Sequence, residues 1–309
     1  MLTPENTEYL KKLSRLTDIE YAIASTLRKY WFPAQTVPGK SPAQSLEIVE
    51  DLLQGVPLFQ PDSHVCEVPI VWLNCQLLDA MKADSLARVF ATIMARGGLK
   101  AMAEANAAGV GPVARICGYD FFAATANRRG QACVVAWHPE TWQLVSSCEH
   151  CETAIVGELP ELRMTAEVVL RHIQTGIMLR LLASHFKSLR GGWELTARVR
   201  FKQTSNLLEA IERSPMLPTI AAGDYNCFLD RLRAYGNKDV DPFVTQNWSL
   251  LGGLEDERPT QLLGGRLDGM FFKWLREGMV FDRYQIIPVY SAAPEVTDHA
   301  ILIGTLYLS

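Results

Sequence analysis

The chain places acidic, amide and imidazole side chains at the ends of several short apolar segments. In chain order these residues are Asn74, Glu104, His185, Asp224, Asn226, Asp268, Asp298 and His299. Carboxylates that share one site repel one another unless a cation lies among them. Oxygen ligands suit Mg²⁺ or Mn²⁺ rather than Zn²⁺, and Mg²⁺ pairs readily with phosphate oxygens. If the segment ends meet, the residues are suited to metal-assisted attack of water on a phosphodiester.

The segment from Leu217 to Asp230 shows how such residues are positioned. An apolar run from Leu217 to Ala222 predicts a buried strand, and Gly223 permits a tight turn at its end. Asp224 and Asn226 then point to the same side of an extended segment. Taken alone, the two side chains are typical of a turn in which Asp and Asn cap their own backbone. The other polar segment ends favour a functional site instead.

The rest of the pattern predicts an α/β (α+β) fold, a two-layered mixed β-sandwich flanked by helices. Strand patterns cover residues 68–73, 113–126, 131–137, 142–146, 177–184, 217–222, 266–272, 280–289 and 300–308, and helix patterns cover 84–96 and 193–214. Strands interleaved with few helices favour a mixed sandwich over a doubly wound sheet. The polar, irregular stretch 236–265 predicts a long loop, and such loops are more often functional than idle.

The chain is expected to divide into a short N-terminal helical segment, residues 1–60, and a main domain, residues 65–309. Apolar residues recur at helical spacing over 4–31, and a capping-box pattern at Ser41 begins a second helix. This segment carries no constellation of reactive groups. We expect it to pack on the main domain, with docking of a protein partner as the alternative.

The net charge of −4 and the pI near 5.9 exclude a global basic field that would hold nucleic acid. A polyanion must therefore be held by a local patch or through a bound cation. Lys187 and Arg190 follow His185 in sequence, and Arg129 lies in a predicted turn that could reach the same site. All three are candidates for binding a phosphate backbone. A solvated helix face is the alternative interpretation of the basic run after His185.

Nothing in the sequence predicts membrane insertion or secretion. No apolar run reaches the ~18 residues of a membrane span, and the first residues lack the apolar core of a secretory signal. The seven scattered cysteines are typical of reduced thiols. A cytoplasmic location is expected, with export by a signal-less route as the alternative.

Residues 148–151 read Cys-Glu-His-Cys, which is metal-like spacing. A structural zinc site needs four ligands, and no second ligand pair lies nearby in the sequence. Cys133 or His138 would have to fold close to complete such a site. We therefore expect an ordinary loop here.

The polar segments resemble, in their order and in their residues, the motifs of the endonuclease/exonuclease/phosphatase superfamily, the deoxyribonuclease-I-like fold. The segments that carry the resemblance are Ile70 to Gln76, Ala183-Ser184-His185-Phe186-Lys187-Ser188, Gly223-Asp224-Tyr225-Asn226, Arg266-Leu267-Asp268-Gly269-Met270-Phe271 and Thr297-Asp298-His299-Ala300. The resemblance covers residues 65–309. One motif departs from it, because Met102-Ala103-Glu104 stands where the family usually shows Leu-Gln-Glu. A solvated helical glutamate is the alternative interpretation of Glu104.

The resemblance implies roles for the polar residues around a metal ion. Glu104 and Asp298 would hold Mg²⁺, with Asn74 nearby and Mn²⁺ as a substitute metal. Asp224 and Asn226 would position the attacking water.

The resemblance also implies how protons move. His299, oriented by Asp268, would take a proton or stabilise charge, and His185 would bind the scissile phosphate or protonate the leaving oxygen. We therefore expect a divalent-metal-dependent phosphodiester hydrolase, most of all a nuclease on DNA or RNA. The alternatives are a phosphatase or phosphodiesterase on a phospholipid head group or small nucleotide, and a catalytically inactive interaction protein on the same fold.

Overall fold

The computed structural model describes residues 67–75, 98–106, 114–125, 131–156, 159–187, 193–227, 229, 241–256, 258–261, 266–288, 297 and 299–308. The predicted N-terminal segment, residues 1–60, and the predicted helix over 84–96 lie outside these ranges and stay predictions.

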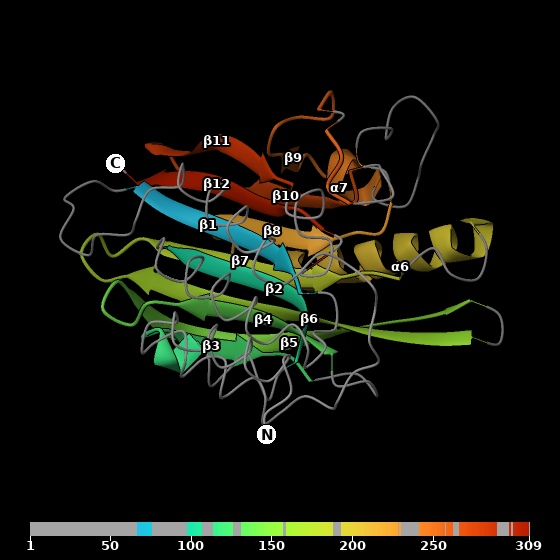
Figure 1. Ribbon diagram of the computed structural model, residues 1–309, viewed down its shortest axis with the longest axis horizontal. Helices are drawn as coiled ribbons and strands as arrows, with labels where there is room; N and C mark the ends of the chain where they lie inside the picture. The colour runs from blue at the N-terminus through green and yellow to red at the C-terminus, as the bar shows by residue number, and fades with distance from the viewer. Residues whose placement is uncertain are drawn as a thin grey trace, which may run out of the picture.

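Two six-stranded sheets stack face to face (Figure 1). The first sheet has the order β11-β12-β1-β2-β4-β3 and the second β5-β6-β7-β8-β10-β9. In the first sheet the strands are β1 (Glu67–Asn74), β2 (Leu99–Asn106), β3 (Asp120–Ala123), β4 (Gln131–Trp137), β11 (Met279–Ile287) and β12 (Ile301–Leu308). In the second they are β5 (Trp142–Val156), β6 (Leu159–His172), β7 (Met178–His185), β8 (Thr219–Asp224), β9 (Ser249–Leu250) and β10 (Asp268–Lys273). The predicted two-layered mixed sandwich is confirmed.

The facing sides of the two sheets form the main hydrophobic core. Val68, Ile70 and Trp72 alternate along β1 and pack in one cluster with Leu170 of β6 and Met270 of β10. This period of two places every second side chain of a strand on one face. Burying one such side chain fully stabilises the fold by about 1.5–3 kcal/mol. The same alternation determines which residues at the strand ends can face the site.

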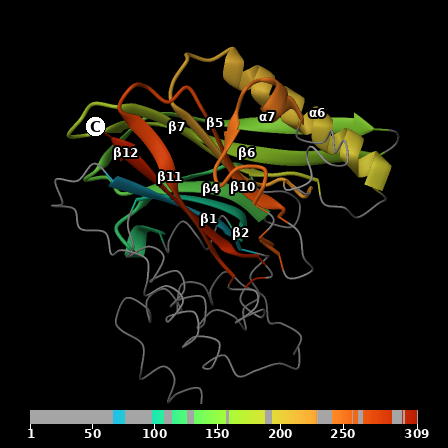
Figure 2. The ribbon, with the colours of Figure 1, turned by 90° about the horizontal axis from the view of Figure 1, so that it is seen from above.

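Two helices cover the other face of the second sheet (Figure 2). They are α6 (Trp193–Glu212) and α7 (Asp241–Thr245). Leu208 of α6 and Phe243 of α7 pack with Leu182 of β7 and Phe271 of β10 in a separate buried cluster. Within the described ranges, no helix combines the length and apolar character that crossing a membrane requires.

Strand pairing brings the polar strand ends to one edge of the sandwich. β1 and β2 run parallel, so that Asn74, the last residue of β1, pairs with the residue before Glu104. β7 and β8 also run parallel, and their last residues, His185 and Asp224, are register partners. β10 runs antiparallel to β8 and starts with Asp268 opposite Asp224. Each sheet therefore contributes polar residues at neighbouring strand ends.

The β5–β6 pair corrects two expectations. Residues 148–151 lie inside β5, so the predicted loop is wrong. The strand continues to Val156, far beyond the predicted end at residue 146, because it pairs with β6 along its whole length. No strand was predicted for β6, in which polar side chains such as Arg163, Thr165 and Glu167 alternate with apolar ones.

Other departures are local. Residues 114–116 form a helical turn, and only Asp120–Ala123 form the strand predicted over 113–126. The stretch 236–265, predicted as a loop, contains α7 and β9. Glu104 lies in a strand, so the interpretation of its segment as helix is wrong.

Gly98 is required where the chain enters β2. Its φ is +71°, and a Cβ atom on it would lie 1.7 Å from the carbonyl oxygen of Pro69 in β1. A side chain at this φ costs about 1–2 kcal/mol, and the contact with backbone adds about 1–3 kcal/mol. We expect Gly98→Ala to lower the free energy of unfolding by more than about 2 kcal/mol, measured by urea denaturation.

Gly176 is the matched control for this prediction. Its φ is +70°, but no heavy atom lies within 4 Å of its added Cβ. Gly176→Ala therefore carries the cost of a side chain at positive φ but not the cost of a contact with backbone. Equal losses of stability for the two variants would contradict the close approach of Gly98 to β1.

Candidate active site

His299 and Asp268 form a buried imidazole–carboxylate pair at the edge where the sheets meet. The Nδ1 atom of His299 lies 2.8 Å from Oδ2 of Asp268, and both side chains are buried. A carboxylate at this distance accepts the Nδ1 proton and leaves a lone pair on Nε2. That Nε2 atom lies 3.8 Å from Oδ2 of Asp224 and 3.4 Å from the amide nitrogen of Asn74. The pair can therefore act as an oriented proton acceptor.

Asp268 is fixed by contacts that the motifs did not predict. The indole N–H of Trp72, in β1 of the opposite sheet, donates to Oδ1 of Asp268 at 2.9 Å. The hydroxyl of Thr260 accepts hydrogen bonds from the backbone N–H groups of Leu267 and Asp268, each at 2.9 Å. Thr260 also accepts the N–H of Ala300 through its carbonyl at 2.7 Å. The stretch predicted as a functional loop thus links β10 to the segment that carries His299.

Asp224 has one oxygen in the turn and the other in the site. The backbone N–H of Asn226 donates to Oδ1 of Asp224 at 2.9 Å, so the self-capping turn considered from sequence is present. The amide of Asn74 donates to Oδ2 at 2.9 Å. Asn226 itself has a φ of +52°, which Asn tolerates better than most residues. Its side-chain amide donates to the carbonyl of Phe186 at 3.1 Å and ties the ends of β7 and β8 together.

Glu104 reaches the site through a β-bulge. The register between β2 and β4 shifts between Met102 and Ala105, and Glu104 has a φ of +49° within this bulge. A bulge redirects the side chain of the extra residue. Oε1 of Glu104 lies 3.3 Å from Nε2 of His185, and Gln131 of β4 donates to Oε2 at 3.0 Å. The structure thus brings Glu104 to the site despite the altered motif.

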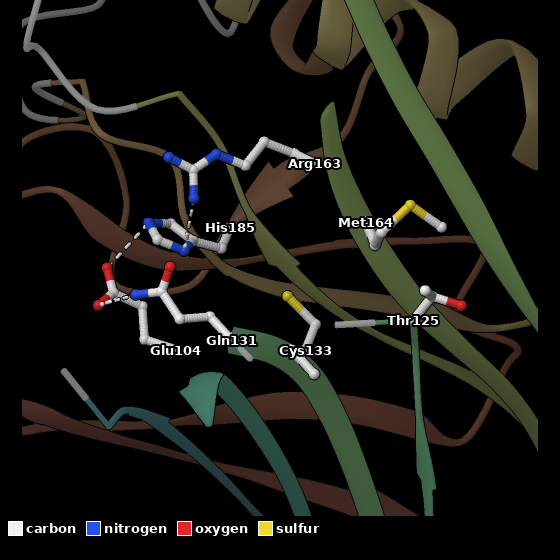
Figure 3. A pocket seen from close by; sticks show the side chains of 8 residues that line it. Glu104, Thr125, Gln131, Cys133, Arg163, Met164 and His185 are labelled. Atoms are coloured by element: carbon white, nitrogen blue, oxygen red, sulfur yellow. Dashed lines mark hydrogen bonds and ion pairs between the residues drawn. The ribbon is translucent and has the colours of Figure 1, made fainter. Parts of the chain in front are cut away.

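A pocket opens beside this glutamate (Figure 3). It is lined by Glu104, Thr125, Gln131, Ala132, Cys133, Arg163, Met164 and His185. Arg163 of β6 places Nη1 3.4 Å from Nδ1 of His185, on the side of the ring opposite Glu104. Because an arginine N–H can only donate, Nδ1 accepts and Nε2 carries the proton. His185 therefore presents an N–H to the anionic side of the site.

Burial and neighbouring charges determine the protonation of the site. Burial, the carboxylate of Asp268 and that of Glu104 raise the pKa of Asp224 to about 7, against the opposing effect of His299. Burial, Arg163 and His299 hold the pKa of His185 well below its usual value. His185 is therefore neutral at pH 7. Asp224 is only partly ionised when nothing else supplies positive charge.

These groups fit a divalent cation. Asp224, Asp268 and His299 each offer one ligand atom within 4.8 Å of the others. Burial and then the carboxylates of Asp268 and Glu104 raise the pKa of Asp224, and a cation at this edge would oppose all three effects. Oxygen-rich, acidic sites of this kind suit Mg²⁺ or Mn²⁺. Glu104 and Asn74 adjoin the same cluster, through His185 and Asp224 respectively.

Of the four remaining predicted residues, the structure describes only Lys187. Asp298, Arg129 and Arg190 lie outside the described residues, so their roles stay predictions. Lys187 is described, and its backbone is held against α6: its N–H donates to Gln203 at 3.0 Å, and its carbonyl accepts from Arg200 at 3.2 Å.

Sequence reasoning missed Trp72, Arg163 and Thr260. Trp72 carries the usual pattern of a core residue, and Arg163 lies in the strand that was not predicted. The role of Thr297, which lies within the last motif, could have been predicted because a threonine hydroxyl can bond to nearby backbone groups. Its hydroxyl donates to the carbonyl of Asn74 at 2.8 Å and accepts the N–H of His299 at 3.1 Å.

No family model and no curated protein matches the sequence. Solved structures do match the fold. An endonuclease/exonuclease/phosphatase family protein from Bacteroides thetaiotaomicron has a TM-score of 0.61 at 12% identity, over 80% of this chain and 99% of that one. The human Nocturnin catalytic domain has a TM-score of 0.62 at 16% identity, over 79% and 94%. TDP2 from D. rerio, complexed with a single-strand DNA product, has a TM-score of 0.61 at 17% identity, over 78% of this chain and 98% of that one. The chain thus has the endonuclease/exonuclease/phosphatase fold that its motifs predicted.

Proposed function

We propose that the protein is a divalent-metal-dependent phosphodiester hydrolase that cuts nucleic acid. The observation that carries the proposal is the meeting of Asn74, Asp224, Asp268 and His299 at one buried edge. Such a set holds both an oriented base and carboxylates that need a cation. The motifs, the shared fold and a neighbour bound to a DNA product support the choice of phosphodiester chemistry.

The base is the Asp268–His299 pair. Asp268 holds the imidazole in the tautomer whose Nε2 lone pair can take a proton from water, and it stabilises the imidazolium that forms. Asp224, 3.8 Å from that Nε2, is placed to align the same water. Asn74 keeps Asp224 in position by donating to its Oδ2 atom.

His185 would serve the phosphate rather than the water. With Nδ1 accepting from Arg163, its Nε2–H group points toward Glu104 and Asp224, 3.3 Å and 3.6 Å away. A neutral imidazole in this tautomer donates a hydrogen bond to a phosphate oxygen. Its lowered pKa makes it a weak choice for protonating the leaving oxygen. We therefore assign it to binding the scissile phosphate.

Glu104, Asp224 and Asp298 would hold the metal, with Asn74 nearby. Asp268 would orient His299, because its two oxygens accept from Trp72 and His299. When bound, Mg²⁺ supplies charge stabilisation to the phosphoryl oxygens and lowers the pKa of its water. The protein contributes the fixed carboxylates and the removal of bulk water from the edge.

The first experiment measures hydrolysis of plasmid DNA, single-stranded DNA, RNA and a generic phosphodiester, with Mg²⁺ and with EDTA. We expect metal-dependent cleavage of a nucleic acid, and a loss of at least about 10²-fold in kcat for Asp224→Asn and His299→Ala. Asp120→Asn, at an exposed position in β3, is the matched control and retains activity. Cleavage of only the small ester would favour the phosphatase alternative. No cleavage and no Mg²⁺ binding would favour an inactive interaction protein.

Trp72 should affect catalysis through Asp268. Trp72→Phe keeps the apolar ring but removes the indole N–H that donates to Oδ1 of Asp268. We expect kcat to fall by about 10-fold or more, as for other groups that orient a ligand or base, with KM nearly unchanged. Trp142→Phe is the control, because its equally buried indole N–H has no partner among the described residues. A similar loss in both variants would mean that packing, not the hydrogen bond, is responsible.

Asp224 should make the metal-free protein less stable as pH rises. Its folded pKa of about 7 lies above the unfolded value, which is about 3.9. Between these values the folded state binds more protons, so the free energy of unfolding falls with increasing pH. In EDTA we expect wild-type stability to decline from pH 4 to pH 7 more steeply than that of Asp224→Asn, measured by urea denaturation. Parallel profiles would show that Asp224 is ionised without a cation.

A further inference from the structure

A second cluster of ligand-type side chains lies on the β5–β6 pair. Cys148 of β5 is the register partner of Glu167 of β6, and His150 follows two residues later on the same face of β5. The Sγ atom of Cys148 lies 3.5 Å from Nε2 of His150, which lies 2.7 Å from Oε2 of Glu167. One ligand atom from each residue falls within 4.8 Å of the other two. None of the three belongs to the candidate active site.

The strand separates this cluster from the rest of the Cys-Glu-His-Cys motif. Neighbouring residues of a strand point to opposite faces, so Glu149 and Cys151 point away from Cys148 and His150. The contacts of Glu149 agree, because its carboxylate accepts from the N–H and hydroxyl of Thr125, just after β3 in the first sheet, at 2.6 Å and 3.0 Å. The spacing in sequence suggests that both cysteines bind one metal ion. In the fold, however, Glu167 and not Cys151 lies beside Cys148 and His150.

We propose that Cys148, His150 and Glu167 bind a Zn²⁺ ion, with water in the fourth position. Thiolate, imidazole and carboxylate are the three side-chain ligands that zinc takes in proteins. Zinc bonds of about 2.0–2.3 Å in a tetrahedron separate neighbouring ligand atoms by about 3.2–3.6 Å. The Cys148–His150 separation already has this value. The His150–Glu167 hydrogen bond would open by about half an ångström as zinc replaces its proton.

Glu167 is held in the orientation that this site requires. Nε of Arg180 donates to Oε1 of Glu167 at 3.0 Å, and Nη2 of Arg180 donates to the carbonyl of Pro215 at 3.0 Å. Arg180 and Glu167 are both buried, with relative exposures of 1% and 5%. The remaining oxygen, Oε2, consequently faces His150. Such outer partners fix a ligand carboxylate and tune its affinity for metal.

The site also has an entrance. Cys148 is exposed and His150 is partly exposed, whereas Glu167 lies beneath them. A metal can therefore enter from the thiol side, with water completing the tetrahedron there. A structural ion pair would account for the contact between His150 and Glu167. It would not account for the thiol of Cys148 beside them.

The test uses the whole chain, reduced and treated with a chelator, and Co²⁺ as the spectroscopic probe. We expect a thiolate-to-cobalt charge-transfer band in the near ultraviolet that Zn²⁺ abolishes by competition. Cys148→Ser should lose the band, and His150→Ala should weaken Co²⁺ binding by about tenfold or more. Cys151→Ser is the matched control, since it removes the other exposed cysteine of the motif, and it should keep the band.

Two further measurements separate this site from the candidate active site. Asp224→Asn should retain the band, because the active-site cluster contains no thiol. In the Asp224→Asn background, which removes a ligand of the active-site cluster, Zn²⁺ should raise the Tm of the otherwise unchanged and Cys151→Ser proteins but not that of Cys148→Ser, because zinc joins β5 to β6. The proposal is overturned if the wild type shows no band at millimolar Co²⁺, or if Cys148→Ser shows the wild-type band. Either result leaves the proposed hydrolase activity unaffected.

Discussion

Asp224 and Asp268 lie opposite each other on neighbouring strands, where burial and the Asp268 carboxylate both raise the cost of ionising Asp224. The fold meets this cost with hydrogen bonds, from Asn74 to Asp224 and from Trp72 and His299 to Asp268. Those bonds satisfy oxygen lone pairs but bring little positive charge. The excess negative charge is what makes the edge suited to a cation. The bulge at β2 and the turn after β8 direct side chains toward the same edge.

The protonation of His185 shows how neighbours decide a role that residue type leaves open. A histidine near a phosphate site can act as an acid or as a neutral donor. Arg163 on one side and carboxylates on the other select the tautomer with hydrogen on Nε2, and burial favours the neutral form. The arginine comes from β6, a strand of the second sheet. Assigning the role thus required the fold as well as the motif.

The polar strand ends could be predicted because a buried strand leaves a clear apolar run, and the residue after it is conspicuous when it is Asp224 or His185. The partners could not be predicted, because they depend on pairing between distant segments. Trp72 lies 196 positions from Asp268 and has the pattern of an ordinary core residue. Glu104 required a bulge, whose extra residue leaves no mark on periodicity. β6 escaped detection because its outer face carries polar groups that pair only within the folded sheet.

The last strand, β12, lies between β11 and β1. It therefore pairs the C-terminal end of the described chain with β1, its most N-terminal strand. His299 and Thr297 stand just before this strand, and Thr297 binds the carbonyl at the end of β1. Pairing of β12 with β1 thus places His299 within reach of Asp268 and Asp224, which belong to the other sheet. A shift in this register would move the imidazole away from both carboxylates. The geometry of the candidate site therefore depends on the register of one strand pair in the sheet that does not carry Asp224 or Asp268.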